Sequence, residues 1–295
     1  MRVQLFLPYQ PPLDFAALLG FLEARAIPGV ERVESGAWRR AVRVSGFTGV
    51  ATVRAATDGA PTLELSIGGA RRPTAAVVEE VARGVRRVFD LDADPAAVAE
   101  QLGKDRRLAP LLAARPGLRI AGAFDPFEMA VRGIVGQQIS VKGAVTLLGR
   151  IAGAHGEPLN DPGGLTRIFP GPEVLAGVDL APHGLTRARA AAVRAIAGAL
   201  REGALTLEPA GTLEETVARL VALPGIGPWT AQYVAMRALG EKDAFVAGDL
   251  GVRKALARGK ELPSVAEVTR RAERWRPYRA YAVMQLWTGG QRAGR

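Results

Sequence analysis

The sequence predicts an α+β protein, with an N-terminal antiparallel sheet and its helices followed by an all-α core. In the first 90 residues, several segments alternate apolar and polar side chains, as strands with one buried face do. After residues 90–95 this alternation stops, and apolar residues recur at helical spacing between Gly- and Pro-containing loops. A length of 295 residues is enough for two or three domains, each with its own core.

Three segments of the N-terminal part are expected to be strands. Residues 2–7 and 62–67 alternate clearly, the second more strictly than the first. Residues 50–56 are expected to pair with residues 62–67 across a turn that contains Asp58 and Gly59. Val3, Leu5 and Leu7 share one face of the first strand, and Leu63, Leu65 and Ile67 are expected to face inward.

Helix signals follow at four places. Residues 15–25 form one expected helix, and a second follows Thr74 with one stripe of Val77, Val78, Val81, Val85 and Val88. Residues 125–128 combine a capping Asp, a proline in the first turn and Glu128 at the capping-box position. Residues 212–215 carry a similar start signal, and residues 153–172 are expected to be a surface connection.

Composition excludes several kinds of site. The chain has no cysteine, which excludes disulfides, thiolate zinc sites, iron–sulfur clusters and cysteine nucleophiles. His155 and His183 are too few for most transition-metal sites, and both are expected to be exposed in loops. No apolar run is long enough for a membrane span, and residues 1–8 lack the apolar core of a signal peptide. We therefore expect a cytoplasmic protein.

The charge balance is basic, with 39 Lys and Arg against 29 Asp and Glu, a net charge of +10. Such an excess favours a polyanionic partner through counterion release, or an acidic membrane surface. A solvated surface in an arginine-rich chain is an equal alternative. Charge alone does not decide between these interpretations.

The most informative motif is Leu-Pro-Gly-Ile-Gly-Pro-Trp-Thr-Ala at residues 223–231, between two helical segments. Gly225 and Gly227 permit positive φ and let a phosphate approach the main chain. The helix that follows would offer unpaired N–H groups and its positive dipole end. Ile226, between the glycines, would anchor the hairpin in the core. The alternative is an ordinary tight turn between two helices.

Asp249 and three aromatic residues form the second signal. Asp249 directly precedes a helical segment, where an aspartate alone is more often only an N-cap. Asp243 is its nearest rival. Trp229 and Tyr233 are four residues apart on one helix face, and Trp287 lies near the end of the last helix. All three could instead be core aromatics.

Together, this hairpin and the later Asp249 resemble the helix–hairpin–helix DNA glycosylase superfamily. Over nearly its whole length the sequence resembles the bacterial DNA-3-methyladenine glycosylase II group, in residues 19–25, 114–119, 132–140 and 272–279. The resemblance implies a small antiparallel-sheet domain followed by a two-lobed helix–hairpin–helix glycosylase core. It divides the chain into residues 1–90, residues 121–240 with the hairpin, and residues 91–120 plus 241–295 with the catalytic Asp.

The resemblance also implies roles for particular residues. Asp249 would be catalytic, Gln138 would fill the gap left by a flipped nucleotide, and Leu250 departs from the aromatic residue expected there. Trp229 stands where strand-nicking relatives have a lysine nucleophile, which implies a monofunctional enzyme. The base pocket would comprise Trp229, Tyr233, Trp287 and Phe21, the DNA-backbone hairpin Gly225, Ile226, Gly227, Thr230 and Ala231, and the neighbouring contact loop Gln137 and Ser140. No cofactor would be required, although a structural Na⁺ or K⁺ could bind the main-chain carbonyls of Val221, Leu223 and Ile226.

The expected function is a monofunctional DNA glycosylase that flips out and hydrolytically excises alkylated bases from duplex DNA, including 3-methyladenine and 7-methylguanine. It would leave an abasic site for base excision repair, acting as a monomer at the bacterial nucleoid without a membrane partner. Cleavage of an N-glycosidic bond builds positive charge on the sugar, which one carboxylate can stabilise. The alternatives are a non-catalytic helix–hairpin–helix protein that binds DNA structures, and a glycosylase for oxidised guanine.

Overall fold

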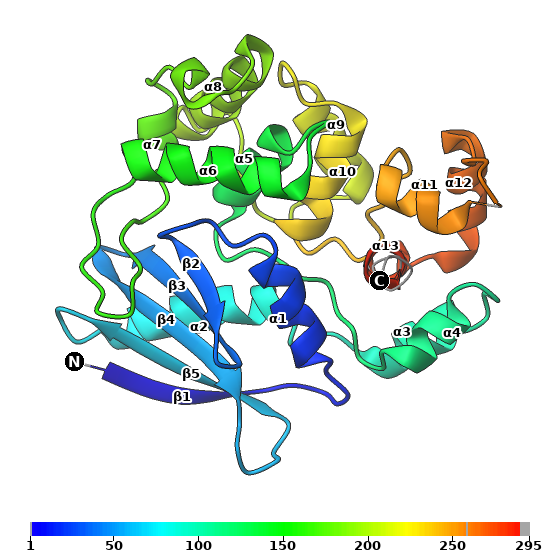
Figure 1. Ribbon diagram of the computed structural model, residues 1–295, viewed down its shortest axis with the longest axis horizontal. Helices are drawn as coiled ribbons and strands as arrows, with labels where there is room; N and C mark the ends of the chain where they lie inside the picture. Colours follow the sequence, from blue (N-terminus) through cyan, green and yellow to red (C-terminus); the bar gives the residue numbers. More distant parts are fainter. Residues whose placement is uncertain (1, 258, 290–295) are drawn as a thin grey trace.

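A five-stranded antiparallel sheet forms the N-terminal part of the computed structural model, which describes residues 2–257 and 259–289 (Figure 1). The strand order is β1-β5-β4-β3-β2, and every neighbouring pair is antiparallel. The three expected strands are confirmed as β1, β4 and β5, whereas the sequence did not predict β2 and β3. The bounds are β1 Arg2–Pro8, β2 Glu31–Glu34, β3 Ala37–Val44, β4 Phe47–Ala55 and β5 Thr62–Gly69.

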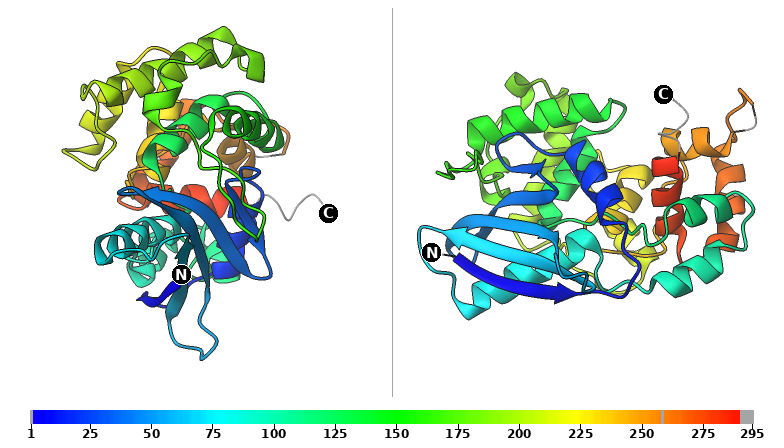
Figure 2. Two further views of the ribbon diagram at one scale, coloured as in Figure 1. Left: turned by 90° about the vertical axis from the view of Figure 1, so that its left-hand side faces the viewer. Right: turned by 60° about the horizontal axis from the view of Figure 1, so that its bottom comes forward.

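The sheet is covered on both faces at β3. Helix α2 (Ala75–Phe89) packs on one face, where Leu63, Leu65 and Ile67 are fully buried. A connection within residues 156–171 crosses the other face, where Leu165 packs against Ala41 of β3. Figure 2 shows α2 and this connection on opposite sides of the strands. Because β3 is covered from both sides, its side chains lack the alternation that identifies a half-buried strand.

Beyond the sheet, the described residues form helices joined by loops, with one isolated bridge between Pro158 and Arg167. One apolar cluster holds together the helices from α5 to α10, and another joins the sheet to residues of α11, α12 and α13. None of the helices in the described ranges is long and apolar enough to cross a membrane. The helices are α1 Phe15–Glu23, α3 Pro95–Leu102, α4 Ala109–Ala114, α5 Pro126–Val135, α6 Val141–His155, α7 Pro172–Leu175, α8 Arg187–Arg201, α9 Leu213–Val221, α10 Pro228–Arg237, α11 Leu250–Leu256, α12 Val265–Ala272 and α13 Arg279–Gly289, with short 3₁₀ turns η1 Ala181–His183 and η2 Glu273–Trp275.

The expected helix starts are confirmed with one correction. Thr212 and Glu215 form a reciprocal capping box at α9. Asp125 Oδ1 accepts from the Phe127 and Glu128 amides at the start of α5. However, the Glu128 carboxylate does not serve the cap, because it binds the guanidinium groups of Arg40 and Arg132 instead. A neighbouring charge cluster thus outweighs the local capping preference.

The two histidines also differ from the expectation. His155 is the last residue of α6 and His183 lies in η1, and each is half-buried. Their Nε2 atoms are 2.8 Å apart, in hydrogen-bond contact, with the rings edge-on. Burial and the neighbouring His183 lower the pKa of His155. The expectation of two separate exposed loop histidines is therefore wrong.

Asp90 ties the sheet domain to the C-terminal helix. It ends α2 in the left-handed conformation with φ 50°, and its Oδ2 accepts a 2.7 Å hydrogen bond from the Tyr281 hydroxyl of α13. Burial raises the pKa of Asp90 to about 6, although the Tyr281 bond and the Arg119 charge partly oppose the shift. At neutral pH the ionised carboxylate therefore disfavours the folded state relative to the unfolded chain.

We expect Asp90→Asn to stabilise the protein at pH 7.5 but not at pH 4. A carboxylate whose folded pKa is raised loses its favourable contribution as the pH rises through about 6. The amide keeps an acceptor for Tyr281 and tolerates the left-handed backbone. The gain in free energy of unfolding at pH 7.5 should be on the order of 1–2 kcal/mol. Urea unfolding at both pH values measures it, and an equal change at both would contradict the assignment.

Candidate active site

A cavity of about 360 Å³ opens between the sheet domain and the helical part of the chain. At one end it is lined by the Asp249 carboxylate and three aromatic residues from α10 and α13, Trp229, Tyr233 and Trp287. The rest of its wall comes from α1, α2, the β2–β3 hairpin, residues 122–125, α5 and α6, with a few residues of the adjoining loops and of α11. Residues separated by more than 200 positions in the sequence thus line one cavity. Its lining also includes Leu22, Arg25, Met129, Arg132, Ile139, Arg237 and Gly251.

Asp249 is held from three directions. It is the N-cap of α11, where Oδ1 accepts from the Val252 amide at 2.9 Å. The same oxygen accepts from the Trp287 indole N–H at 2.8 Å, and Oδ2 accepts from the Trp229 indole N–H at 3.3 Å. The carboxylate is half-buried at the cavity surface. It therefore has a fixed orientation while remaining open to the cavity.

The aromatic residues form a connected wall. Trp229 and Tyr233 stack with ring centroids 5.2 Å apart and an interplanar angle of 17°. Tyr233 and Trp287 are tilted by 47° at 6.4 Å. The i, i+4 spacing of Trp229 and Tyr233 on α10 places both rings on one side of the helix. Such electron-rich faces attract a flat cation through stacking and cation–π interaction.

Phe21 lies behind this wall. Its ring stacks on Trp287 with centroids 6.1 Å apart, and only 4% of Phe21 is exposed. Two arginines lie against the Phe21 ring, Arg25 at 3.6 Å and Arg237 at 4.9 Å. Arg237 also donates to the Tyr233 hydroxyl at 3.1 Å. Phe21 therefore supports Trp287 from behind.

Arg25 and Arg237 were missed in the sequence analysis. Each follows an aromatic residue of the site by four positions, Arg25 after Phe21 and Arg237 after Tyr233, so helical spacing would have placed them beside it. Burial lowers the pKa of Arg25 to about 10, and burial also lowers the pKa of Arg237. Both guanidinium groups remain cations at neutral pH.

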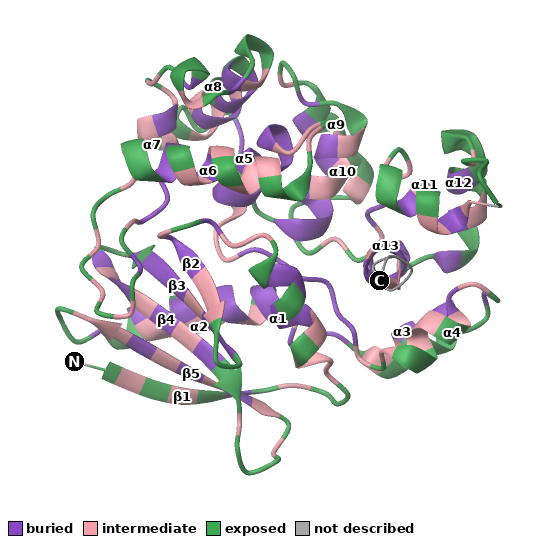
Figure 3. Ribbon diagram, in the orientation of Figure 1, coloured by how far each residue is buried: buried purple, intermediate pink, exposed green. Residues whose placement is uncertain are grey.

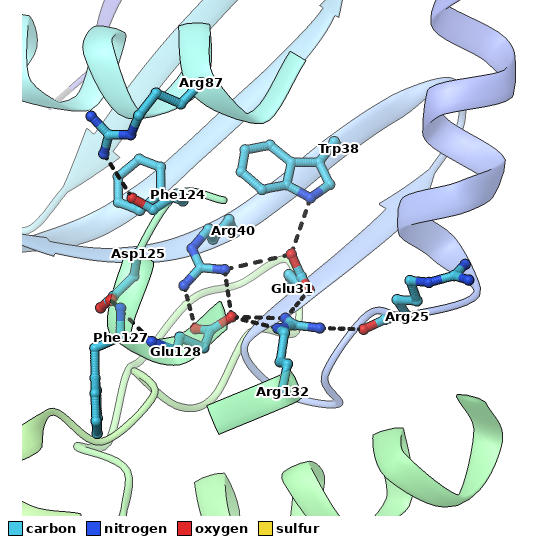
Figure 4. Close-up of polar contacts among 10 residues, drawn as sticks. All are labelled: Arg25, Glu31, Trp38, Arg40, Arg87, Phe124, Asp125, Phe127, Glu128 and Arg132. Carbon is cyan, nitrogen blue, oxygen red and sulfur yellow. Dashed lines mark hydrogen bonds and ion pairs between the residues drawn. The ribbon is translucent and has the colours of Figure 1, made fainter. Parts of the chain in front are cut away.

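A buried ion-pair cluster joins the sheet domain to α5 (Figure 4). Glu31 of β2 and Arg40 of β3 face each other across the strands on the core side of the sheet. Glu128 of α5 accepts from Arg40 at 3.1 Å, and from Arg132 at 2.9 Å. Arg132 also donates to Glu31, whose other oxygen accepts from Trp38 at 3.2 Å. Two cations and two anions thus neutralise one another away from water.

This cluster fixes the α1 side of the cavity. Arg132 donates to the main-chain carbonyl of Arg25 at 2.6 Å, just beyond the end of α1. Burial favours the neutral form of Glu128, but Arg40 and Arg132 outweigh it and lower the pKa of Glu128 to about 2. Glu31 and Glu128 likewise keep the pKa of Arg132 above its ordinary value despite burial. The cluster is therefore fully charged at neutral pH.

The hairpin between α9 and α10 has two different glycines. Gly225 has φ +77°, and a Cβ there would lie 2.7 Å from the Ala192 Cβ of α8. Gly227 is the N-cap of α10, and a Cβ there would meet no atom within 4 Å. Ile226 between them is 4% exposed and packs in the core of the helical lobe. Packing of the hairpin against α8 therefore requires a glycine at position 225, whereas Gly227 leaves the N-terminus of α10 accessible to a ligand.

The loop between α5 and α6 is tied to this hairpin. Gln137 Nε2 donates to the Gly225 carbonyl at 3.2 Å and to Thr230 Oγ1 at 2.9 Å. Gln138 is exposed at the loop tip with φ 54°, an uncommon conformation for a residue with a side chain. Ser140 caps α6 by accepting from the Gly143 amide at 3.1 Å. Gln137 thus connects the hairpin to the residue expected to act as the wedge.

Comparison with known proteins places the chain in a family. The model of the AlkA N-terminal domain matches residues 4–125. DNA-3-methyladenine glycosylase 2 of Escherichia coli (strain K12) is 38% identical over 288 residues, covering 95% of this chain and 95% of that protein. The chain belongs to the DNA-3-methyladenine glycosylase 2 family.

Two further members of this glycosylase group match along nearly the whole chain. A probable bifunctional transcriptional activator/DNA repair enzyme AlkA of Mycobacterium tuberculosis is 40% identical over 97% of this chain, which spans only 57% of that relative. The solved 3-methyladenine DNA-glycosylase of Archaeoglobus fulgidus is 26% identical, with a TM-score of 0.83 over 98% of this chain and 99% of that one. The predicted fold class, a sheet domain followed by a helix–hairpin–helix glycosylase core, is confirmed.

The other residues that the glycosylase resemblance singled out lie at different depths. Thr230 and Ala231 are buried, so a DNA contact at these positions would have to come from the main chain. Leu250, beside Asp249, is 53% exposed. Asp243, the rival carboxylate, accepts from Arg279 through both oxygens and from Arg276. Asp243 therefore belongs to a structural ion pair.

We expect Arg132→Met to destabilise the protein by roughly 3–5 kcal/mol, because it leaves the two buried carboxylates Glu31 and Glu128 with Arg40 as the one cation that pairs with both. The loss should shrink as the pH is lowered towards 4, since unpaired buried carboxylates have raised pKa values and become neutral. Arg43→Met is the matched control, because its ion pairs with Glu157 and Glu173 are exposed. Urea unfolding measures both variants. Equal losses of unfolding free energy in the two variants would show that the buried cluster contributes no more to stability than an exposed ion pair.

Proposed function

We propose that this chain is a monofunctional DNA glycosylase that excises alkylated bases from duplex DNA, leaving an abasic site. The observation that carries the proposal is the carboxylate of Asp249, fixed by the indole N–H groups of Trp229 and Trp287 at the aromatic end of the cavity. The names of the E. coli and A. fulgidus relatives point to 3-methyladenine. We extend the class to 7-methylguanine and related lesions, and we propose that the protein acts as a monomer on chromosomal DNA.

The proposed reaction begins with extrusion of the damaged nucleotide, because its glycosidic bond is inaccessible within the base stack. Gln138, exposed at the loop tip, would fill the gap in the duplex. The α10 N-terminus would bind a backbone phosphate through its free amides beside Gly227. A duplex gripped at the hairpin and opened at this loop would present the extruded base to the cavity.

The extruded base would then lie against the aromatic wall. An alkylated purine such as 7-methylguanine carries positive charge, so the faces of Tyr233 and Trp287 attract it by roughly 0.5–2 kcal/mol. The same charge makes the base a good leaving group without a strong general acid. A neutral oxidised base would gain less from these rings, which disfavours the alternative of an oxidised-guanine glycosylase.

Bond cleavage would take the bonding electron pair onto the base and leave an oxocarbenium ion on the sugar. The Asp249 carboxylate stabilises that positive charge and accepts a proton from the attacking water as it bonds to C1′. The products are the free base and an abasic sugar. Trp229 occupies the hairpin position of a lyase lysine, and no lysine is among the described residues that line the cavity. The strand would therefore remain intact.

A non-catalytic DNA-binding protein would need the hairpin alone. It would not require a carboxylate held by two indole rings inside a cavity.

We propose also that a Na⁺ or K⁺ ion bridges the hairpin to a phosphate through the carbonyls of Val221, Leu223 and Ile226. Carbonyl oxygens suit such ions, and the Leu223 carbonyl, which accepts from the Ile226 amide at 3.2 Å, retains a second lone pair. The proposed reaction needs no other cofactor.

We expect Asp249→Asn to lower the rate of base release by roughly 10²–10³ or more, because the amide cannot stabilise the sugar cation. Chromatography of the free base released from a methylated duplex measures this rate. Binding to a duplex with an abasic-site analogue should persist, since the hairpin is untouched. Asp243→Asn serves as the matched control. If it abolished release while Asp249→Asn did not, the assignment of Asp249 would fail.

We expect Gly227→Val to weaken binding to damaged and undamaged duplexes alike, by roughly tenfold or more, as the side chain blocks a phosphate hydrogen bond. The melting temperature should fall only slightly, because a Cβ at this position meets no atom within 4 Å and valine is merely a poorer N-cap than glycine. Gly225→Val is the contrasting variant, with a loss of stability of roughly 1–3 kcal/mol from the contact with Ala192. Titration of a labelled duplex and thermal unfolding separate the two effects. Undiminished binding by Gly227→Val would remove the hairpin from the DNA interface.

A further inference from the structure

The loop between α5 and α6 forms part of the rim of the cavity. Gly136, Ile139 and Ser140 line the cavity, whereas Gln138, between Gly136 and Ile139 in the sequence, is exposed. The Gln138 side chain forms no hydrogen bond with any residue in the described ranges. The direction of this side chain is therefore set by the main chain of the loop.

The main chain of Gln138 is in the left-handed conformation, with φ 54°. This conformation is disfavoured for a residue with a side chain, because the Cβ atom approaches the following carbonyl oxygen. Rotation of the planar peptide group between Gln137 and Gln138 changes φ of Gln138 together with ψ of Gln137, and can return Gln138 to an ordinary conformation. The observed loop tip therefore depends on a contact that fixes this peptide group.

Arg189 of α8 makes that contact. Its guanidinium group donates to the main-chain carbonyl of Gln137, which belongs to the same peptide group. Arg189 is half-buried, and a hydrogen bond from a charged donor is stronger than one between two neutral groups. The carbonyl is thus held by a cation on a helix rather than by another part of the loop.

Helix α8 is itself packed against the hairpin. A Cβ on Gly225 would lie 2.7 Å from the Ala192 Cβ and 3.7 Å from the Ala188 carbonyl oxygen, so the two main chains approach closely. One side of α8 is buried in the core of the helical lobe, while other residues of this helix are exposed (Figure 3). The loop is therefore attached twice, through the Gln137 side chain to the hairpin and through the Gln137 carbonyl to α8.

We propose that Arg189 is a positioning residue for the wedge. By fixing the Gln137 carbonyl, it keeps Gln138 in the left-handed conformation with its side chain exposed at the loop tip. The duplex then meets a side chain whose direction is set before binding, so less of the binding free energy is lost in ordering the loop. This inference rests on the proposed function, because a wedge is needed only if a nucleotide is extruded.

A double-mutant cycle tests whether Arg189 acts through Gln138. Release of 7-methylguanine paired with cytosine is measured by chromatography for the wild type, Arg189→Met, Gln138→Ala and the double variant. Arg189→Met should lower the rate by roughly tenfold or more in the wild-type chain, because a misplaced group costs rate even when the chemistry is untouched. In the Gln138→Ala chain, which has no wedge to position, the same change should cost about twofold or less. Arg194→Met, at an exposed position of α8, is the matched control for the lost positive charge and should leave the rate unchanged.

The pairing of the lesion gives a second readout. A 7-methylguanine placed opposite an abasic-site analogue is already unpaired, so its extrusion costs less free energy. The loss caused by Arg189→Met should therefore be smaller on this duplex than on the paired one. A general loss of folded protein would lower release from both duplexes equally. If Arg189→Met does not fold by circular dichroism, Arg189→Ala replaces it in both experiments.

The inference is overturned if Arg189→Met releases base as fast as the Arg194→Met control. It is also overturned if the losses from Arg189→Met and Gln138→Ala multiply in the double variant, or if the loss is equal on the two duplexes. In each of these cases the proposed function stands. If the wild type releases no base, the proposed function fails, and the inference fails with it.

Discussion

The site depends on one constraint, the placement of the Asp249 carboxylate between two indole N–H groups. Trp229 comes from the second helix of the hairpin and Trp287 from the last helix, so both must be in register with the start of α11. A carboxylate is useful to an oxocarbenium ion only if its direction is fixed before the charge develops. The two indoles supply that direction and are also part of the aromatic wall. Orientation of the carboxylate and the proposed recognition of the base therefore rely on the same side chains.

The sheet domain contributes to this arrangement through charge burial. Glu31 and Arg40 lie on the core face of the sheet, where isolated charges would strongly disfavour folding. Glu128 and Arg132 of α5 complete a neutral cluster, and Arg132 extends it to the carbonyl of Arg25. The end of α1 is thereby held against the cavity. Stability of the domain junction and the shape of one cavity wall are consequences of the same four side chains.

Much of the fold and site could be predicted where the signal is local. Alternation identified β1, β4 and β5, and the motif at residues 223–231 identified the hairpin and, with the family resemblance, Asp249. The strands β2 and β3 were missed because Glu31 and Arg40 place charges where a strand pattern requires apolar residues. Their compensation comes from α5, far along the chain, and only the tertiary structure brings it there.

The two hydrogen bonds from Gln137 to the hairpin have a mechanical consequence. They tie the turn that we propose holds a DNA strand to the neighbouring loop tip that would enter the base stack, so we expect the turn and the tip to move together. A protein molecule that slides along a duplex would then hold Gln138, which probes the base stack, at a constant distance from the hairpin, which binds the backbone. The same fixed spacing would then serve both to probe each base pair for damage and to position the sugar of the extruded nucleotide against the Asp249 carboxylate.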